Sequence, residues 1–165
     1  MFPEPKRIAQ IGDGFLFIMP KPSGEENLEE DLVYLKRLGI TDIVSLLEFS
    51  ESRELGLTEE ETISNSLGIE FKQFPIVDRS IPTETSAFIS LVRLSASTIR
   101  RGAHLVGHCR AGIGRSGIFT SAILIASGHS TEEATNLVSS ARGVSIPDTD
   151  EQLEWLYKNA SSFAA

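Results

Sequence analysis

The segment from Ala103 to Ala126 is the part of the sequence that most narrows the folds open to this chain. Its start, 103–107, is a short apolar run that predicts a buried strand. From Arg115 to Ala126 the chain is apolar almost all round a helix, which predicts a helix at the centre of the fold. The loop between them follows the carboxyl end of a strand, which is where α/β folds bind ligands. The segment therefore predicts both a fold and a binding site.

Hydrophobic spacing elsewhere predicts strands and helices that alternate along the chain. Strands are expected at 8–11 and 15–19, as a hairpin, and at 43–47 and 69–74. Helices are expected from Leu28 to Gly39, from a capping box at Thr58–Glu61 to Gly68, and from a point after Pro82 to Gly102. Two more are expected, one from Ser130 through Ala141 and one at the end of the chain. The last helix should face inward with Leu153, Leu156, Tyr157 and Ala160. This order predicts one α/β domain over residues 1–165, with a central mixed or parallel sheet of about four or five strands flanked by helices.

Composition excludes several classes of protein. The formal net charge of −8 over 165 residues disfavours binding to nucleic acid or to an anionic membrane surface. The most hydrophobic stretch, 117–126, is too short to cross a bilayer, and the first residues carry no apolar run of signal-peptide length. A cytoplasmic protein is therefore expected. We also expect no metal or cofactor. The single cysteine, Cys109, cannot form an internal disulfide, and beside a histidine it is a candidate nucleophile, although buried inert cysteines are common.

The loop after the strand has the composition of an anion cradle. We expect Gly112 and Gly114 to permit positive φ angles, so that successive backbone N–H groups turn inward, while the next helix directs its positive end to the same point. Arg115 offers a planar guanidinium that can hold two phosphate oxygens, which lysine cannot do. The expected phosphate-binding residues are Arg110, Ala111, Gly112, Ile113, Gly114 and Arg115.

The same groups should activate Cys109. Inward N–H groups and a helix N-terminus lower the pKa of a cysteine thiol and so favour the nucleophilic thiolate. Ser116 could donate its hydroxyl to the sulfur and make it a better leaving group. His108 precedes the cysteine on a strand, where neighbouring side chains point to opposite faces, so we expect it to support the loop by hydrogen bonding.

The segment 108–117 resembles the signature loop of the cysteine-dependent protein tyrosine phosphatases, in particular the compact dual-specificity group. The resemblance lies in His108-Cys109, followed by five residues and then by Arg115-Ser116-Gly117. The upstream segment Pro75–Arg79 resembles the general-acid loop of that family. The resemblance implies Cys109 as nucleophile, Arg115 as phosphate clamp, Asp78 as acid for the leaving phenol and Ser116 as helper of the second step. Without the cysteine motif, Asp78 would be interpreted as a turn residue before a proline-containing loop.

Gln152 is a further supporting candidate. The segment 142–152 resembles the late loop that, in some relatives, brings a glutamine to the water of the second step. Thr149 and Gln152 also have the spacing of a capping box for the last helix, so a purely structural role is open.

The implied function is hydrolysis of phosphotyrosine in a phosphorylated protein or peptide through a phosphocysteine, with phosphoserine and phosphothreonine as further candidate substrates. Two alternatives stay open. A rhodanese-like sulfurtransferase has a similar loop, but with one residue fewer between cysteine and arginine and no use for Asp78. A non-catalytic phosphopeptide-binding module could use the same cradle. The neutral residues Ala111, Ile113 and Gly114 favour phosphoprotein over phosphoinositide, and Arg110 and Arg79 could add local positive charge or simply be solvated.

Overall fold

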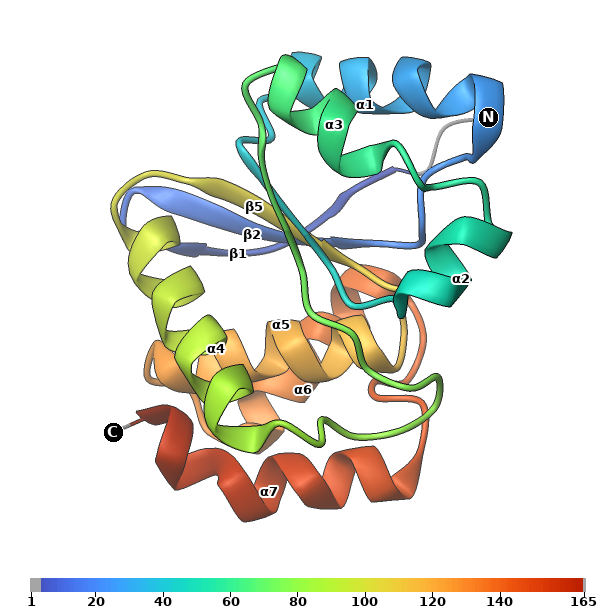
Figure 1. Cartoon of the computed structure of the whole chain (residues 1–165). Helices are drawn as coiled ribbons and strands as arrows, with labels where there is room; N and C mark the ends of the chain where they lie inside the picture. Colours follow the sequence, from blue (N-terminus) through green and yellow to red (C-terminus); the bar gives the residue numbers. More distant parts are fainter. Residues whose placement is uncertain (1–3, 165) are drawn as a thin grey trace.

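Five strands form one mixed sheet in the computed structural model, which describes residues 4–164 (Figure 1). The strands are β1 (Lys6–Ile11), β2 (Gly14–Met19), β3 (Asp42–Ser45), β4 (Glu70–Gln73) and β5 (His104–His108). Their order is β1-β2-β5-β3-β4, with β1 antiparallel to β2 and the other neighbours parallel. Met19 and Ser45 both pair with His108, so three parallel strands end level at one edge. The predicted α/β fold with a mixed sheet is confirmed.

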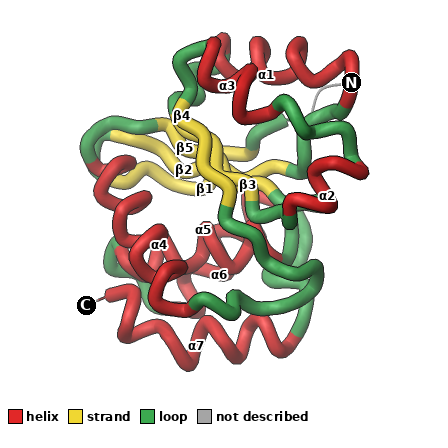
Figure 2. Tube along the Cα trace, viewed as in Figure 1, coloured by secondary structure: helices red, strands yellow, loops and turns green. Residues whose placement is uncertain are grey.

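Helices cover both faces of this sheet (Figures 1 and 2). The helices are a 3-10 turn, η1 (Glu25–Asn27), and α1 (Leu28–Arg37), α2 (Phe49–Glu54), α3 (Glu60–Ser66), α4 (Thr85–Arg100), α5 (Arg115–Ala126), α6 (Thr131–Arg142) and α7 (Asp150–Ala164). α1 and α3 lie on one face, and α4 to α7 lie on the other. No helix within residues 4–164 has the length and apolar character needed to span a membrane.

α5 is the central helix, as predicted. It packs against α4, α6 and α7, and each of its residues from Arg115 to Ile125 is buried. A side chain at Gly107 of β5 would meet the Phe119 ring at 2.9 Å, so glycine there lets α5 approach the strand closely. The loop between β5 and α5 is thus held between two buried elements.

In the region before β4, one prediction is wrong and one short helix was missed. The expected capping box at Thr58 does not form, since α3 begins at Glu60 and no side chain caps it. Glu60 instead points into the protein and contacts His108, which places the start of the helix later than the sequence pattern suggests. The short helix α2 was not predicted, because its six residues, FSESRE, show no helical repeat of apolar residues.

The inward face of α7 also differs from the prediction. Tyr157 is 54% exposed, and Leu153 and Ala160 are only half-buried. Trp155 and Phe163 face inward because their rings pack against Phe88, with centroids 5.5 and 6.3 Å away. Burial of these two rings leaves Tyr157, whose ring carries a polar hydroxyl group, on the exposed side of the helix.

Candidate active site

A pocket of about 310 Å³ opens at the level edge of the sheet, above the loop that follows β5. Its lining comes from three loops: the phosphate-binding loop (residues 109–115), the acid loop (residues 75–82) and the connection between α6 and α7. The lining residues are Asp78, Arg79, Cys109, Arg110, Ala111, Ile113, Gly114, Arg115 and Asp148. The structure thus brings the predicted nucleophile, clamp and acid into one cavity.

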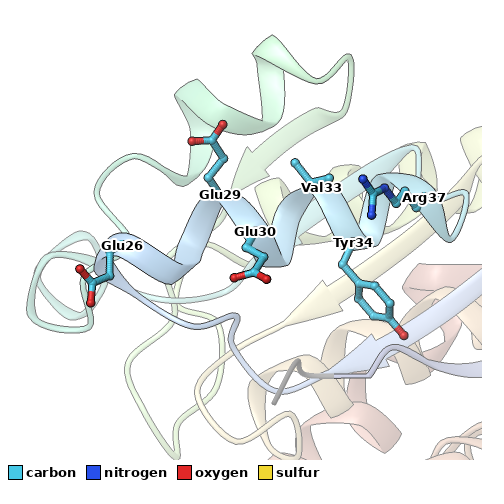
Figure 3. A pocket seen from close by; sticks show the side chains of 6 residues that line it. All are labelled: Glu26, Glu29, Glu30, Val33, Tyr34 and Arg37. Carbon is cyan, nitrogen blue, oxygen red and sulfur yellow. The ribbon is translucent and has the colours of Figure 1, made fainter.

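A second hollow, of about 610 Å³, lies along α1 (Figure 3). Its lining is Glu26, Glu29, Glu30, Val33, Tyr34 and Arg37, and the close-up shows these side chains spread over one exposed side of the helix. It contains no nucleophile, and α1 lies on the face of the sheet opposite α5. The chemistry of the chain is therefore expected at the smaller pocket.

The phosphate-binding loop is held from behind by its carbonyl groups. His108 Nδ1 lies 3.2 Å from the carbonyl oxygen of Cys109, and the backbone N–H of Lys21 donates to that of Arg110. Arg142 donates from Nη2 to the oxygen of Ala111 and from Nε to that of Gly112, at 3.1 and 2.9 Å. The carbonyls are thus bound behind the loop, and on the pocket side the backbone N–H groups of Gly112 and Ser116 contact Cys109, an arrangement that suits an anion site.

The two glycines of the loop serve different purposes, which corrects one expectation. Gly112 has a φ of +74°, and a side chain there would meet the backbone oxygen of Met19 at 2.6 Å. Gly114 has an ordinary φ of −79°. It must be small because a side chain would approach Gln152 Nε2 at 3.0 Å and Asp148 Cβ at 3.1 Å. Only Gly112 is required for a left-handed backbone.

Cys109 sits at the base of the pocket, with its sulfur 3.1 Å from the hydroxyl oxygen of Ser116. Burial raises the pKa of the Cys109 thiol. The Ser116 hydroxyl, the backbone N–H groups of Ser116 and Gly112 and the charge of Arg115 together outweigh burial, so the pKa is lowered from its ordinary value. A thiolate is therefore available at lower pH than for a free cysteine.

Arg115 is 1% exposed and is held by three partners. Its Nη1 donates to Glu51 Oε1 at 2.6 Å and to the carbonyl oxygen of Ile76 at 2.8 Å. Its Nη2 donates to Glu51 Oε2 at 3.0 Å and to Asp78 Oδ1 at 3.1 Å. Its Nε has no hydrogen-bond partner among residues 4–164. The bidentate contact with Glu51 fixes the plane of the guanidinium beside the loop.

His108 forms a buried pair with Glu60 on the side of the loop away from the pocket. Nε2 of His108 lies 2.7 Å from Glu60 Oε2, and the two side chains are 0% and 3% exposed. Burial lowers the pKa of His108, but the charge and hydrogen bond of Glu60 outweigh it, so the pKa is raised. His108 is thus placed to support the loop from behind, where it contacts the Cys109 backbone.

The remaining predicted residues lie around the mouth. Asp78 is 56% exposed and touches Arg115, while Arg110, Ala111 and Ile113 line the pocket wall. Gln152 is fully buried next to Gly114 and forms both bonds of the predicted capping box: its N–H donates to Thr149 Oγ1, and Thr149 N–H donates to Gln152 Oε1, each at 3.1 Å.

Three residues that hold the site were missed in the sequence: Glu51, Glu60 and Arg142. Glu51 accepts a hydrogen bond from the backbone N–H of Glu48 at the start of α2, which follows β3 at the edge where the site lies. The sequence did hold one signal for Glu51: it is an acidic residue that follows a strand ending at the edge where ligands bind. For Glu60 and Arg142 nothing in the local sequence indicates a contact with the loop.

Several proteins of known structure share this fold. Kinase-associated phosphatase, with serine in place of its catalytic cysteine, is 19% identical with a TM-score of 0.88, over 100% of this chain and 98% of that one. Tk-PTP in its active form is 28% identical with a TM-score of 0.74, over 98% and 99%. Human tyrosine phosphatase-like serine/threonine/tyrosine-interacting protein is 18% identical with a TM-score of 0.74, over 98% of both chains.

Among curated proteins, none matches the sequence. A family model does match, over residues 18–129, which is more than half of the chain, and it is described as "Polymorphic toxin system, DSP-PTPase phosphatase". The matched segment runs from β2 to just beyond α5 and includes Asp78, Cys109 and Arg115. The compact dual-specificity type predicted from the loop is therefore confirmed, and the chain belongs to the DSP-PTPase phosphatases of this family.

Proposed function

We propose that the chain hydrolyses phosphotyrosine monoesters in proteins or peptides through a covalent phosphocysteine at Cys109. The observation that carries the proposal is the position of the Cys109 sulfur, 3.1 Å from Ser116 Oγ, at the base of a pocket that Arg115 and Asp78 also line. Nucleophile, clamp and acid then act on one phosphate. Whether phosphoserine and phosphothreonine are also substrates is a separate question of specificity. The cytoplasm remains the predicted location of the protein.

The chemistry balances over two steps with these groups. In the first, the Cys109 thiolate attacks phosphorus, the bond from phosphorus to the phenol oxygen breaks, and Asp78 gives its proton to that oxygen. In the second, water attacks phosphorus, the sulfur–phosphorus bond breaks, and the Asp78 carboxylate takes the proton from water. Ser116 donates a hydrogen bond to the departing sulfur, which restores the thiolate.

Arg115 links phosphate binding to the release of Asp78. A guanidinium has five N–H donors, and four of them are bound to Glu51, Ile76 and Asp78, which leaves the Nε donor. Bidentate binding of phosphate through Nε and Nη2 therefore requires Asp78 to leave Nη2. We infer that the arriving phosphate displaces the Asp78 carboxyl group from Arg115 and frees it for the leaving oxygen.

The two alternatives have less support. The matching family model is that of a phosphatase, and a sulfurtransferase would have no task for Asp78. A binding module is a real alternative, because the fold alone is shared with a human protein named as phosphatase-like and interacting. Against it stand Cys109 and Asp78 together in the pocket, since recognition of a phosphate needs neither a nucleophile nor an acid.

Turnover of a mixed panel of phosphotyrosine, phosphoserine and phosphothreonine peptides by the wild type and Cys109→Ser tests the proposal. We expect phosphate release in excess chelator, because the cradle and Arg115 supply the positive charge. Acid quenching should trap a phosphoenzyme that Cys109→Ser lacks, while that variant still binds phosphopeptide. Binding without turnover by the wild type would support the binding module, and turnover by Cys109→Ser would exclude the mechanism.

A further inference from the structure

The acid loop is fastened on both sides of Asp78. Before Asp78, the N–H of Ile76 donates to Leu46 O at 3.1 Å, and its carbonyl accepts from Arg115 at 2.8 Å. After Asp78, the loop joins the connection between α6 and α7, and Figure 1 shows these two segments passing side by side. Two contacts make this junction: Gln152 Nε2 donates to Ser80 O at 2.9 Å, and Arg79 Nη1 lies 2.7 Å from Asp148 Oδ2.

Gln152 contributes more to this junction than the Arg79–Asp148 ion pair does. Its side chain is 0% exposed, whereas Arg79 is 64% exposed, and exposed ion pairs contribute little. Gln152 Oε1 accepts from the N–H groups of Asp148 and Thr149, both at 3.1 Å, while Nε2 donates to Ser80. The amide is thereby fixed in one orientation, with its oxygen on the start of α7 and its nitrogen on the acid loop.

The backbone of the acid loop supports the same conclusion. Arg79, directly after Asp78, has a φ of +59°, a left-handed conformation that costs a non-glycine residue roughly 1 kcal/mol. Such a conformation persists only where the surroundings impose it. The turn around Asp78 and Arg79 is closed by a hydrogen bond from the N–H of Ser80 to Val77 O at 3.0 Å, and the contacts of Gln152 and Asp148 hold this turn from the side of α7.

We propose that Gln152 is a positioning residue that sets the place of Asp78 above Cys109 by holding Ser80, with the Arg79–Asp148 ion pair as a second attachment. This rests on the proposed phosphatase function and assigns Gln152 to proton donation in the first step. It differs from a role in orienting the water of the second step, because both ends of the amide are already bound to the backbone.

The test is Gln152→Glu beside Thr149→Ala. An ionised glutamate still accepts from Asp148 and Thr149 but cannot donate to Ser80. Thr149→Ala weakens the same end of α7, by roughly 1 kcal/mol for a lost cap, without touching the acid loop. Single-turnover formation of phosphocysteine is measured with phenyl phosphate, whose leaving group needs a proton, and with 4-nitrophenyl phosphate, whose leaving group needs it much less.

We expect Gln152→Glu to slow formation of phosphocysteine from phenyl phosphate on the order of tenfold or more, with less than about threefold loss for 4-nitrophenyl phosphate. Thr149→Ala should form phosphocysteine at nearly the wild-type rate with both substrates. In an Asp78→Asn background, Gln152→Glu should cause little further loss of rate. If Gln152→Glu forms phosphocysteine at an unchanged rate but phosphocysteine accumulates, Gln152 acts instead on the water of the second step, and the proposal is overturned. Equal losses with both substrates would also overturn the proposal. If Gln152→Glu does not fold, Gln152→Met, which has a similar length and no N–H donor for Ser80, is judged by the same comparison of substrates.

A second measurement separates this proposal from the phosphatase function. Amide hydrogen exchange of residues 77–82, without substrate, should be faster in Gln152→Glu than in Thr149→Ala. If the wild type releases no phosphate from any ester, the phosphatase function fails, and the exchange result still decides whether Gln152 holds the loop. Equal exchange in the two variants would overturn the positioning role whatever the activity.

Discussion

Glu60 Oε2 lies 2.7 Å from His108 Nε2, and neither side chain is more than 3% exposed. The other ring nitrogen, Nδ1, lies 3.2 Å from the carbonyl oxygen of Cys109. A carboxylate and a carbonyl both accept hydrogen bonds, so the ring satisfies both only when both nitrogens carry protons. Burial opposes that charged form, but Glu60 outweighs burial and raises the pKa of His108. Both contacts and the raised pKa favour the positively charged form of His108, directly behind Cys109.

Glu60→Gln should lower the free energy of unfolding by about 3 kcal/mol, the scale for breaking a buried pair. The raised pKa of His108 gives the sign of the pH dependence: this stabilisation is complete below about pH 6.5, the unfolded value, and is lost as the pH rises through the folded value. Urea unfolding of wild type and variant across this range measures the difference, with the exposed Glu61→Gln as control. A difference that grows with pH would contradict a charged His108.

Ser116→Ala should raise the pKa of Cys109, because the Ser116 hydroxyl is the strongest of the groups that offset the effect of burial on this thiol. The rate of iodoacetamide alkylation against pH reports the thiolate, and its midpoint should move upward. The same variant loses the donor to the departing sulfur, so the second step should slow and a burst of phenol should precede a slower steady rate. A variant without a burst and with an unmoved midpoint would exclude both roles.

Asp78→Asn should flatten the basic limb of the pH–rate profile, since this limb reports loss of the donated proton. The acidic limb should persist, because it reports formation of the Cys109 thiolate. The loss should be on the order of a hundredfold for phenols of high pKa and smaller for activated leaving groups. Vanadate or phosphate should bind more tightly, since a neutral amide at position 78 competes less strongly than the carboxyl group for Nη2 of Arg115. Equal loss for all leaving groups with the basic limb kept would make Asp78 structural, and Asp148 would then be the next candidate.

Glu51→Gln should weaken phosphate binding and lower stability. Two hydrogen bonds from Arg115 to the carboxylate fix the guanidinium, and the side chain of Arg115 is 1% exposed. Loss of the charge leaves a buried cation poorly compensated, which costs about 3 kcal/mol or more. KM should rise more than kcat falls, as measured with an aryl phosphate, and Glu54→Gln on the exposed side of α2 serves as the control. A variant with normal KM would show that Glu51 does not orient Arg115.

Peroxide should inactivate the enzyme at Cys109, because the thiolate is the form that peroxide attacks. Phosphate or vanadate in the pocket should protect it. The chain has one cysteine, so no internal disulfide can capture the sulfenic acid, and recovery should require added thiol. Mass spectrometry of the peptide with Cys109, with and without vanadate, checks this result. Resistance to peroxide at neutral pH would indicate a protonated thiol.

The strand, loop and helix around Cys109 could be predicted from the sequence because their signals are local. An apolar run, a loop with two glycines and a helix apolar on all sides lie within one continuous segment, and the spacing of Cys109 to Arg115 indicates the phosphate cradle. α2 and the inner face of α7 could not be predicted in the same way. α2 is too short for a periodic pattern, and the orientation of α7 depends on how Trp155 and Phe163 meet Phe88, which lies on a different helix.

By itself the sequence determined the chemical groups of the candidate site and the order of the elements that present them. The tertiary structure decided which distant residues hold those groups: Glu51 on Arg115, Glu60 on His108, Arg142 on the carbonyls of the loop and Gln152 on Ser80. Each of these contacts joins residues far apart in the chain. Their geometry follows from the packing of α2, α3, α6 and α7 around one edge of the sheet, and no periodicity in the sequence encodes it.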